Sequence, residues 1–258
     1  MSQVALRYVF AFTTASIYFI WQKAKFKIDK GSIWLLALIS IFGYGFSNLA
    51  YTYANLNTEV SNALFIFFTF SIITPVIAFL LLKEKMNRYN VIGLLIAFMG
   101  LMLLFRPNSF DTWKIGGMFA LTGAVLQSIY LVGRRQLKTV SSELILLSST
   151  FLGMTSVGTV ALIFENHFYS ASGIGSLSSS TWALTALFGI LNFSGWYFMS
   201  KGFQILTASV GSLLMMWEPV LIAILAFFIY QEIPTIFTII GAGLVTTAVF
   251  IVILKGKG

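Results

Sequence analysis

Residues 209–248 read SVGSLLMMWEPVLIAILAFFIYQEIPTIFTIIGAGLVTTA, and residues 61–100 read SNALFIFFTFSIITPVIAFLLLKEKMNRYNVIGLLIAFMG. Both stretches are 40 residues long and align without a gap at an offset of 148 residues. At this offset Glu84 aligns with Glu232, and a glycine follows each of them nine residues later. A carboxylate at the end of one apolar run, with a glycine at a fixed distance inside the next, indicates an internal duplication.

The composition assigns the whole chain to the lipid bilayer. Of its 258 residues, 58% are hydrophobic and 9% are charged, and the mean hydropathy is +0.91. A soluble domain carries roughly 25% charged residues, so this chain has too few polar groups to cover a surface in water. We therefore expect an all-α, polytopic membrane protein.

Charge and cysteine usage exclude several other classes of protein. The net charge is +8, but the lysines and arginines stand alone or in short clusters between apolar runs, which is typical of membrane topology signals and not of a nucleic-acid site. The chain has no cysteine, which excludes disulfides and thiolate metal or redox sites.

A helix needs about 20 apolar residues to cross the hydrocarbon core. Dividing the sequence at its charged and Pro/Gly/Asn-rich breaks predicts nine such helices, at 4–22, 33–53, 60–82, 89–106, 115–133, 143–163, 181–200, 207–230 and 235–254.

The distribution of lysine and arginine predicts the orientation, because cytoplasmic loops hold an excess of them. With the loop from Lys23 to Lys30 inside, 13 of the 16 basic residues fall on the cytoplasmic side. The longest loop, residues 165–181, has no basic residue and falls outside. We therefore expect a cytoplasmic C-terminus in a multi-pass protein of the plasma membrane, or inner membrane.

In this orientation Glu84 lies on the cytoplasmic side and Glu232 on the outer side, so the two copies insert in opposite directions. The sequence thus predicts two inverted-topology repeats, residues 1–110 with four helices and residues 111–258 with five. Inverted repeats are typical of secondary transporters. Both glutamates are interpreted as groups that cap or clamp adjacent helices, with a gating role left open.

The segment EPVLIAILAFFIYQEIPTIFTIIGAGLVTTAVFIVI, from Glu218, resembles the C-terminal signature of the drug/metabolite transporter superfamily, EamA type. The Glu-Pro pair, the glutamate 13 residues after the proline and the following glycine stand where the family has them. The earlier copy departs from the pattern, with Phe70 and Ser71 at the Glu-Pro positions.

The resemblance implies ten helices with both termini cytoplasmic, one more than the sequence supplies. VALRYVFAF, from Val4, looks like the family's second helix. The first family helix is therefore expected to be absent, either through a misplaced gene start, which we favour, or as a true nine-helix form.

Glu218 is the one acidic residue well inside a predicted span. A charged group at the centre of a membrane helix costs about 2.5 to 3.5 kcal/mol on insertion scales, so something must compensate for it. One interpretation is proton coupling or contact with a solute. The other, slightly favoured, is a carboxyl that locks the helix beside Pro219, because the family shares this pair across very different substrates.

Three further helix faces combine polar and aromatic residues that would avoid lipid. Interhelical hydrogen bonding, worth only about 0.6 kcal/mol on average, explains any single one of them, yet some of the set is expected to line a solute pathway. Arg134 shares one of these faces but is interpreted as a topology charge. The predicted substrate-binding set is Asn48, Tyr51 (or Thr52), Gln127, Tyr130, Asn192, Trp196 and Glu218.

An intramembrane enzyme lacks support, because the only aspartates, Asp29 and Asp111, lie in loops and the only histidine, His167, lies outside the spans. ATP-driven transport lacks a phosphate-binding loop.

We expect a permease that is not an enzyme, has no cofactor and moves a small polar or amphipathic metabolite by alternating access, with proton coupling open. Its expected partners are that small-molecule substrate and the lipid bilayer, not nucleic acid, and a homodimer is left open. A lipid-linked-group flippase and a non-transporting membrane subunit stay as alternatives.

Overall fold

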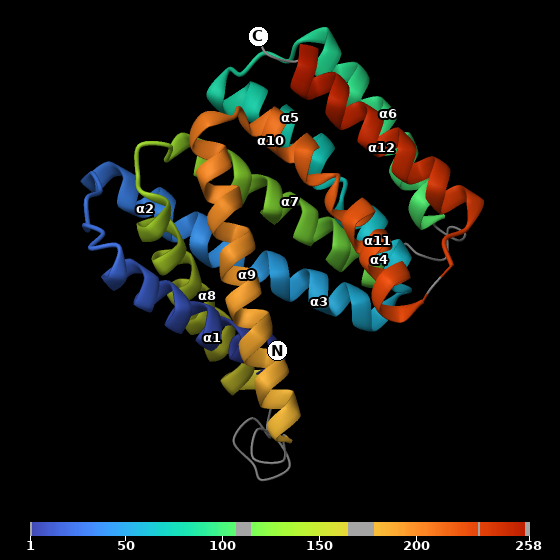
Figure 1. The fold of residues 1–258 in the computed structure, drawn as a ribbon. Helices are drawn as coiled ribbons and strands as arrows, with labels where there is room; N and C mark the ends of the chain where they lie inside the picture. The colour runs from blue at the N-terminus through green and yellow to red at the C-terminus, as the bar shows by residue number, and fades with distance from the viewer. Residues whose placement is uncertain (1, 107–114, 165–177, 232, 256–258) are drawn as a thin grey trace. The chain divides into compact units, whose positions relative to one another are not determined.

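The computed structural model describes residues 2–106, 115–164, 178–231 and 233–255, and all regular structure in these residues is helical (Figure 1). The elements are α1 (Ser2–Trp21), α2 (Lys30–Leu38), η1 (Ile39–Phe46), α3 (Ser47–Asn57), α4 (Val60–Phe67), α5 (Phe70–Leu82), α6 (Arg88–Phe105), α7 (Ile115–Gln136), α8 (Ser142–Phe164), α9 (Ser179–Ile205), α10 (Ala208–Met215), α11 (Glu218–Tyr230) and α12 (Ile236–Lys255).

Within the described part of the chain, eight helical segments are long and apolar enough to cross a membrane. The elements α2, η1 and α3 together form one of them, and each of the pairs α4–α5 and α10–α11 forms another. The ninth predicted span is α9, which has 27 residues but a more polar composition. The chain is an all-α polytopic membrane protein, as its composition predicted. Glu232 and residues 165–177 of the predicted outer loop lie outside the described residues.

Two of the predicted spans are interrupted, and the interruptions occupy equivalent positions in the repeat. Phe68 and Thr69 separate α4 from α5, and Met216 and Trp217, 148 residues later, separate α10 from α11. The same offset relates both ends of α4 to those of α10, and both ends of α5 to those of α11. The duplication seen in the sequence is therefore repeated in the backbone.

The ends of α5 and α11 show the same correspondence. The residue after each helix is left-handed, with φ of 55° at Lys83 and 56° at Gln231. The backbone N–H of each donates to the carbonyl of an equivalent alanine, Ala78 or Ala226. A left-handed residue is a common way to end a helix, and here both copies use it without the glycine that usually occupies that place.

The chain divides into two compact units. Unit 1 comprises residues 1–52 and 133–205, and unit 2 comprises residues 53–132 and 206–258. Each unit takes segments from both predicted repeats, so a compact unit is not a repeat. The division of the sequence at residue 110 stays a prediction.

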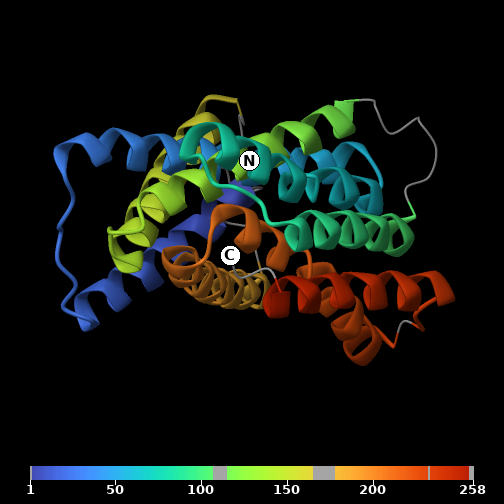
Figure 2. The ribbon, with the colours of Figure 1, turned by 90° about the horizontal axis from the view of Figure 1, so that it is seen from above.

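In unit 2, α6 and α12 lie side by side in both views (Figures 1 and 2). A Cβ built on Gly93 would lie 3.3 Å from the carbonyl oxygen of Ala248, and one built on Gly100 would lie 2.8 Å from that of Gly241. The partner number falls as the α6 number rises, so the helices are antiparallel. Because α6 and α12 are equivalent in the repeat, this is the arrangement that an inverted duplication requires.

In unit 1, α1 packs against α8 and α9, and η1 packs against α8. Ala15 of α1, Leu146 of α8 and Phe193 of α9 form a buried apolar cluster where the three helices meet. These contacts hold the polar side chains of unit 1 in place.

Candidate functional site

An eight-residue π-helix, η1, lies in the middle of the second span. Such helices are rare, and many of those that are known lie at functional sites. The wider turn changes the direction of the side chains that follow. Here it carries Tyr44, whose side chain is fully buried. The element thus places a tyrosine inside unit 1, in a helix that would otherwise be regular.

Tyr44 is the centre of a polar and aromatic cluster. Its hydroxyl donates to Oδ1 of Asn192 on α9 at 3.0 Å, and its ring meets that of Trp196, one turn further on, edge to face at 4.7 Å between centroids. Its carbonyl oxygen accepts from Nδ2 of Asn48 at 2.9 Å and from the hydroxyl of Tyr8 at 2.8 Å. We call these five residues the Tyr44 cluster.

Two glycines allow α8 to approach η1 closely enough to support this cluster. A Cβ built on Gly45 would lie 3.2 Å from Cα of Gly153, and one built on Gly153 would lie 3.1 Å from the Tyr44 ring. Nearby, the hydroxyls of Ser40 and Ser149 are 3.2 Å apart. The ring of Tyr44 therefore rests on a backbone surface that a larger side chain at Gly153 would disturb.

The Tyr44 cluster combines three kinds of contact. Oδ1 of Asn192 accepts the hydrogen bond of Tyr44, and the amide nitrogen of the same side chain can donate to a solute. Nδ2 of Asn48 donates to the carbonyl of Tyr44, and its amide oxygen can accept from a solute. The partly buried ring of Trp196 adds an apolar face. A donor, an acceptor and an aromatic surface suit a small solute that is itself polar and partly apolar.

The structure brings together three of the predicted substrate-binding residues, Asn48, Asn192 and Trp196, around Tyr44. Tyr51 lies one turn after Asn48 on α3 and is partly buried. Gln127 and Tyr130 lie on the part of α7 that belongs to unit 2, where both are buried. Their place in a substrate site stays a prediction.

Glu218, the last residue of the predicted set, is the first residue of α11, directly after the interruption that follows α10. Its side chain is exposed. Pro219 lies in the first turn of α11, where a missing N–H leaves no helical hydrogen bond unmade. The interruption itself falls at Met216 and Trp217, so the proline begins the second half-helix and does not kink a continuous one.

Tyr8 and Tyr44 were not predicted as site residues, although the helical spacing of Tyr44 favoured such a prediction. It lies four residues before Asn48 and therefore on the same helix face that suggested Asn48 and Tyr51. The π-helix itself gave no such signal. Tyr8 lies in the stretch VALRYVFAF, which resembles the family's second helix and gave no indication of a site.

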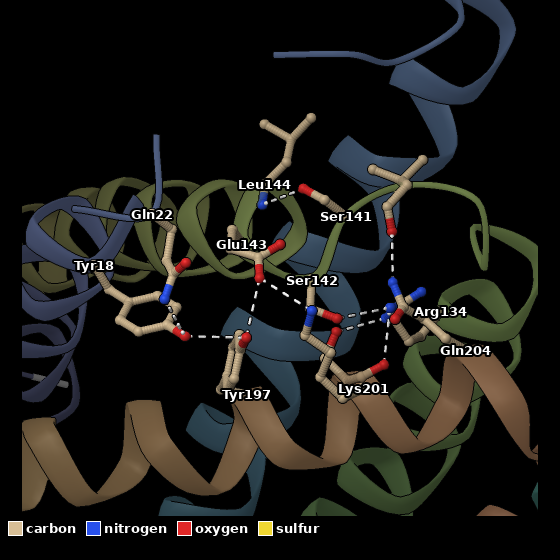
Figure 3. Close-up of polar contacts among 12 residues, drawn as sticks. Tyr18, Gln22, Arg134, Ser141, Ser142, Glu143, Leu144, Tyr197, Lys201 and Gln204 are labelled. Atoms are coloured by element: carbon tan, nitrogen blue, oxygen red, sulfur yellow. Dashed lines mark hydrogen bonds and ion pairs between the residues drawn. The ribbon is translucent and has the colours of Figure 1, made fainter. Parts of the chain in front are cut away.

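Arg134 is fully buried, which a topology charge at a solvated surface would not be. Its guanidinium donates to the hydroxyl of Ser200 at 2.6 Å and to the carbonyl of Ser200 at 2.8 Å. It also donates to the carbonyl of Leu137 at 3.0 Å and to the hydroxyl of Ser142 at 3.2 Å. Figure 3 shows how it joins the end of α7 to α8 and α9. A buried charge requires such a set of partners.

A second polar network in the same view joins α1, α8 and α9 (Figure 3). Oε1 of Glu143 accepts from the hydroxyl of Tyr197 at 3.0 Å and lies 3.1 Å from Nζ of Lys201. The hydroxyl of Tyr18 donates to that of Tyr197 at 3.1 Å, and Gln22 donates to Tyr18 at 3.1 Å. Glu143 lies in the first turn of α8, where the helix dipole favours a negative charge. This network fastens helix ends together.

Comparison with solved structures supports the fold, and comparison with curated proteins leads to transporters. A crystal structure that is 17% identical matches 98% of this chain and 88% of its own chain, with a TM-score of 0.80. An uncharacterized transporter of Bacillus subtilis, YyaM, is 28% identical over 239 residues, which are 88% of this chain and 74% of the relative. Solute carrier family 35 member G1 of Mus musculus is 27% identical over 237 residues, which are 86% of this chain and 62% of the relative.

The family comparison covers nearly the whole chain. The model of the EamA-like transporter family matches residues 1–106 and again residues 114–254. The relatives named above carry the names of transporters. The chain belongs to the EamA-like transporter family.

Proposed function

We propose that the chain is a secondary transporter that moves a small polar or amphipathic metabolite across the membrane by alternating access, and that the Tyr44 cluster contacts the solute. Membership of a transporter family supports the general activity. The chemistry of the cluster supports the substrate class, because Asn192 and Asn48 provide a donor and an acceptor beside the ring of Trp196.

Alternating access is supported by the relation between α6 and α12. They are equivalent helices of a duplication and pack antiparallel around the reciprocal contacts of Gly93 with Ala248 and of Gly100 with Gly241. Two similar halves of opposite orientation allow inward-open and outward-open states of similar free energy. The observation that carries the proposal is the antiparallel packing of the equivalent helices α6 and α12. The polar Tyr44 cluster within the spans supports it.

The experiment is efflux from liposomes that contain the purified protein and are loaded with a defined mixture of amino acids, polyamines, nucleosides and small amines. We expect one chemical class to leave faster than from empty liposomes. For that class Asn192→Ala should raise KM about tenfold or more, because one good hydrogen bond to a solute is worth about that factor.

Ser194→Ala is the matched control, since Ser194 lies on the same helix and donates only to the carbonyl of Ile190 in its own helix. It should leave KM unchanged. Equal effects of the two substitutions would remove Asn192 from the solute site.

We further propose that Glu218 couples transport to protons. An exposed carboxylate in the middle of a span costs several kcal/mol if it faces lipid, so its side chain is better placed facing a water-filled pathway. Its position in the first turn of α11 resembles the half-helix ends that transporters direct at charged solutes. In Glu218→Gln, the rate should lose its dependence on an imposed pH gradient. A pH dependence like that of the original protein would remove Glu218 as the proton carrier.

A further inference from the structure

The carboxylate of Glu84 reaches from the end of one half-helix to the start of another. Glu84 is the second residue after α5, and the N–H of Ala208, the first residue of α10, donates to its Oε2 at 2.9 Å. The first N–H groups of a helix have no partner within the helix. Glu84 therefore supplies an acceptor that α10 needs from elsewhere in unit 2.

The position of Glu84 is fixed by the way that α5 ends. Lys83 is left-handed, and the N–H of Glu84 donates to the carbonyl of Ala78 at 3.3 Å. This turn directs the chain away from the axis of α5. A different cap, Thr207, serves α10 from within its own segment, accepting from the N–H of Val210 at 3.3 Å. The two caps are thus distinct: Thr207 is local to α10, whereas Glu84 bridges to α5.

The bridge lies at one end of a longer contact between α5 and α10. Further along, the hydroxyl of Ser212 donates to the carbonyl of Ser71 at 3.4 Å, and both residues are fully buried. Glu84 thus closes the end of a packed pair of half-helices.

The equivalent pair is not packed in this way. The repeat relates α5 to α11 and α10 to α4, yet among the described residues α4 and α11 form no contact comparable to that between α5 and α10. The two ends of unit 2 therefore differ although their sequences are related. An inverted repeat that is closed at one end only is in one of its two states.

We propose that Glu84 is a latch, a positioning residue whose carboxylate holds the start of α10 against the end of α5 and so stabilises the state that is closed at this end. The proposal rests on alternating access as the proposed function. A hydrogen bond to an ionised carboxylate at a helix start gains from the helix dipole. When the hydrogen bond from Ala208 to Glu84 breaks, α10 keeps the cap of Thr207, so the latch can open and close again.

The absence of native cysteine allows a direct test with Ser212→Cys. Because Ser212 is buried against α5, the introduced thiol should react slowly with a maleimide in purified, detergent-solubilised protein. Adding Glu84→Ala should raise the rate of alkylation about tenfold, since a charge-assisted hydrogen bond shifts an equilibrium by at least that factor. Glu84→Gln keeps a neutral acceptor and should give a smaller rise of about threefold.

Thr207→Ala is the matched control, because it removes the cap that does not bridge the two helices. It should leave the alkylation of the introduced thiol at the starting rate. An equal rise with Thr207→Ala would show that helix capping, and not latching, protects the site. Unchanged rates in both Glu84 variants would overturn the latch, and if Glu84→Ala does not fold, the Glu84→Gln rate alone decides. The assay needs no substrate, so a protein that transports nothing can still show the latch, and one that transports can lack it.

Discussion

Arg134 shows what a single residue does beyond its charge. Four of its hydrogen bonds join the end of α7 to α8 and α9, and a lysine cannot reproduce the planar guanidinium. We therefore expect Arg134→Lys to destabilise the protein by about 3 kcal/mol, measured as a shift in unfolding by denaturant in detergent. Lysine keeps the positive charge, so the substitution does not change the effect of that charge on insertion of the helix into the membrane.

Arg135→Lys is the control for that measurement. Arg135 is partly exposed and donates to the carbonyl of Gln204 at 3.0 Å. Its replacement should cost less than about 1 kcal/mol. If both substitutions cost the same, the buried network does not stabilise unit 1 as the geometry indicates.

The residues of the Tyr44 cluster were only partly predictable. Helical spacing identified Asn48, Asn192 and Trp196, because a face that carries polar groups in a membrane helix must avoid lipid. It did not indicate that Tyr44 would be their common partner, since this depends on how α9 packs against η1. Burial of Arg134 was equally hidden, because a basic residue near a helix end has the same sequence pattern whether it is solvated or enclosed.

At the scale of elements, the closest approach of α6 and α12 depends on Gly241. A Cβ at this position would lie 2.6 Å from the carbonyl oxygen of Gly100 and 2.8 Å from the backbone nitrogen of Leu104. Backbone atoms cannot move aside as a side chain does. Gly241→Ala should therefore destabilise the protein by about 1 to 3 kcal/mol, seen as a lower Tm in detergent.

Gly243, two residues further along α12, has open space around its Cβ position. Gly243→Ala should leave the Tm unchanged or raise it, because alanine favours a helix over glycine by up to about 1 kcal/mol. A loss of Tm in Gly243→Ala as large as that in Gly241→Ala would contradict a specific contact between α6 and α12.

Helix positions were predictable from the sequence because length and apolarity are strong constraints in a bilayer. The predicted span 60–82 begins and ends where α4 and α5 do. Its interruption at Phe68 and Thr69 was not predicted, since this segment has no glycine and Pro75 lies further on, inside α5. The π-helix η1 was also not predicted, because a wider turn leaves no mark on hydropathy.

At the scale of the whole molecule, the repeat and the compact units describe different divisions of the same chain. The repeat relates α4, α5 and α6 to α10, α11 and α12 at one constant offset, and all six elements lie in unit 2. The inverted pair is thus concentrated in one unit, whereas the Tyr44 cluster lies in the other. In the proposed mechanism the Tyr44 cluster of unit 1 contacts the solute, whereas Glu218 and the latch at Glu84 belong to unit 2.

The orientation of the chain can be tested with single cysteines, because the sequence provides no background thiol. Lys138, between α7 and α8, and Ser179, at the start of α9, are both exposed. The excess of basic residues predicts that Lys138 is cytoplasmic and Ser179 is external. In intact cells a membrane-impermeant maleimide should therefore label Ser179→Cys at once and Lys138→Cys only after lysis. The reverse pattern would exchange the two sides of the membrane, and the end closed by Glu84 would then face outward.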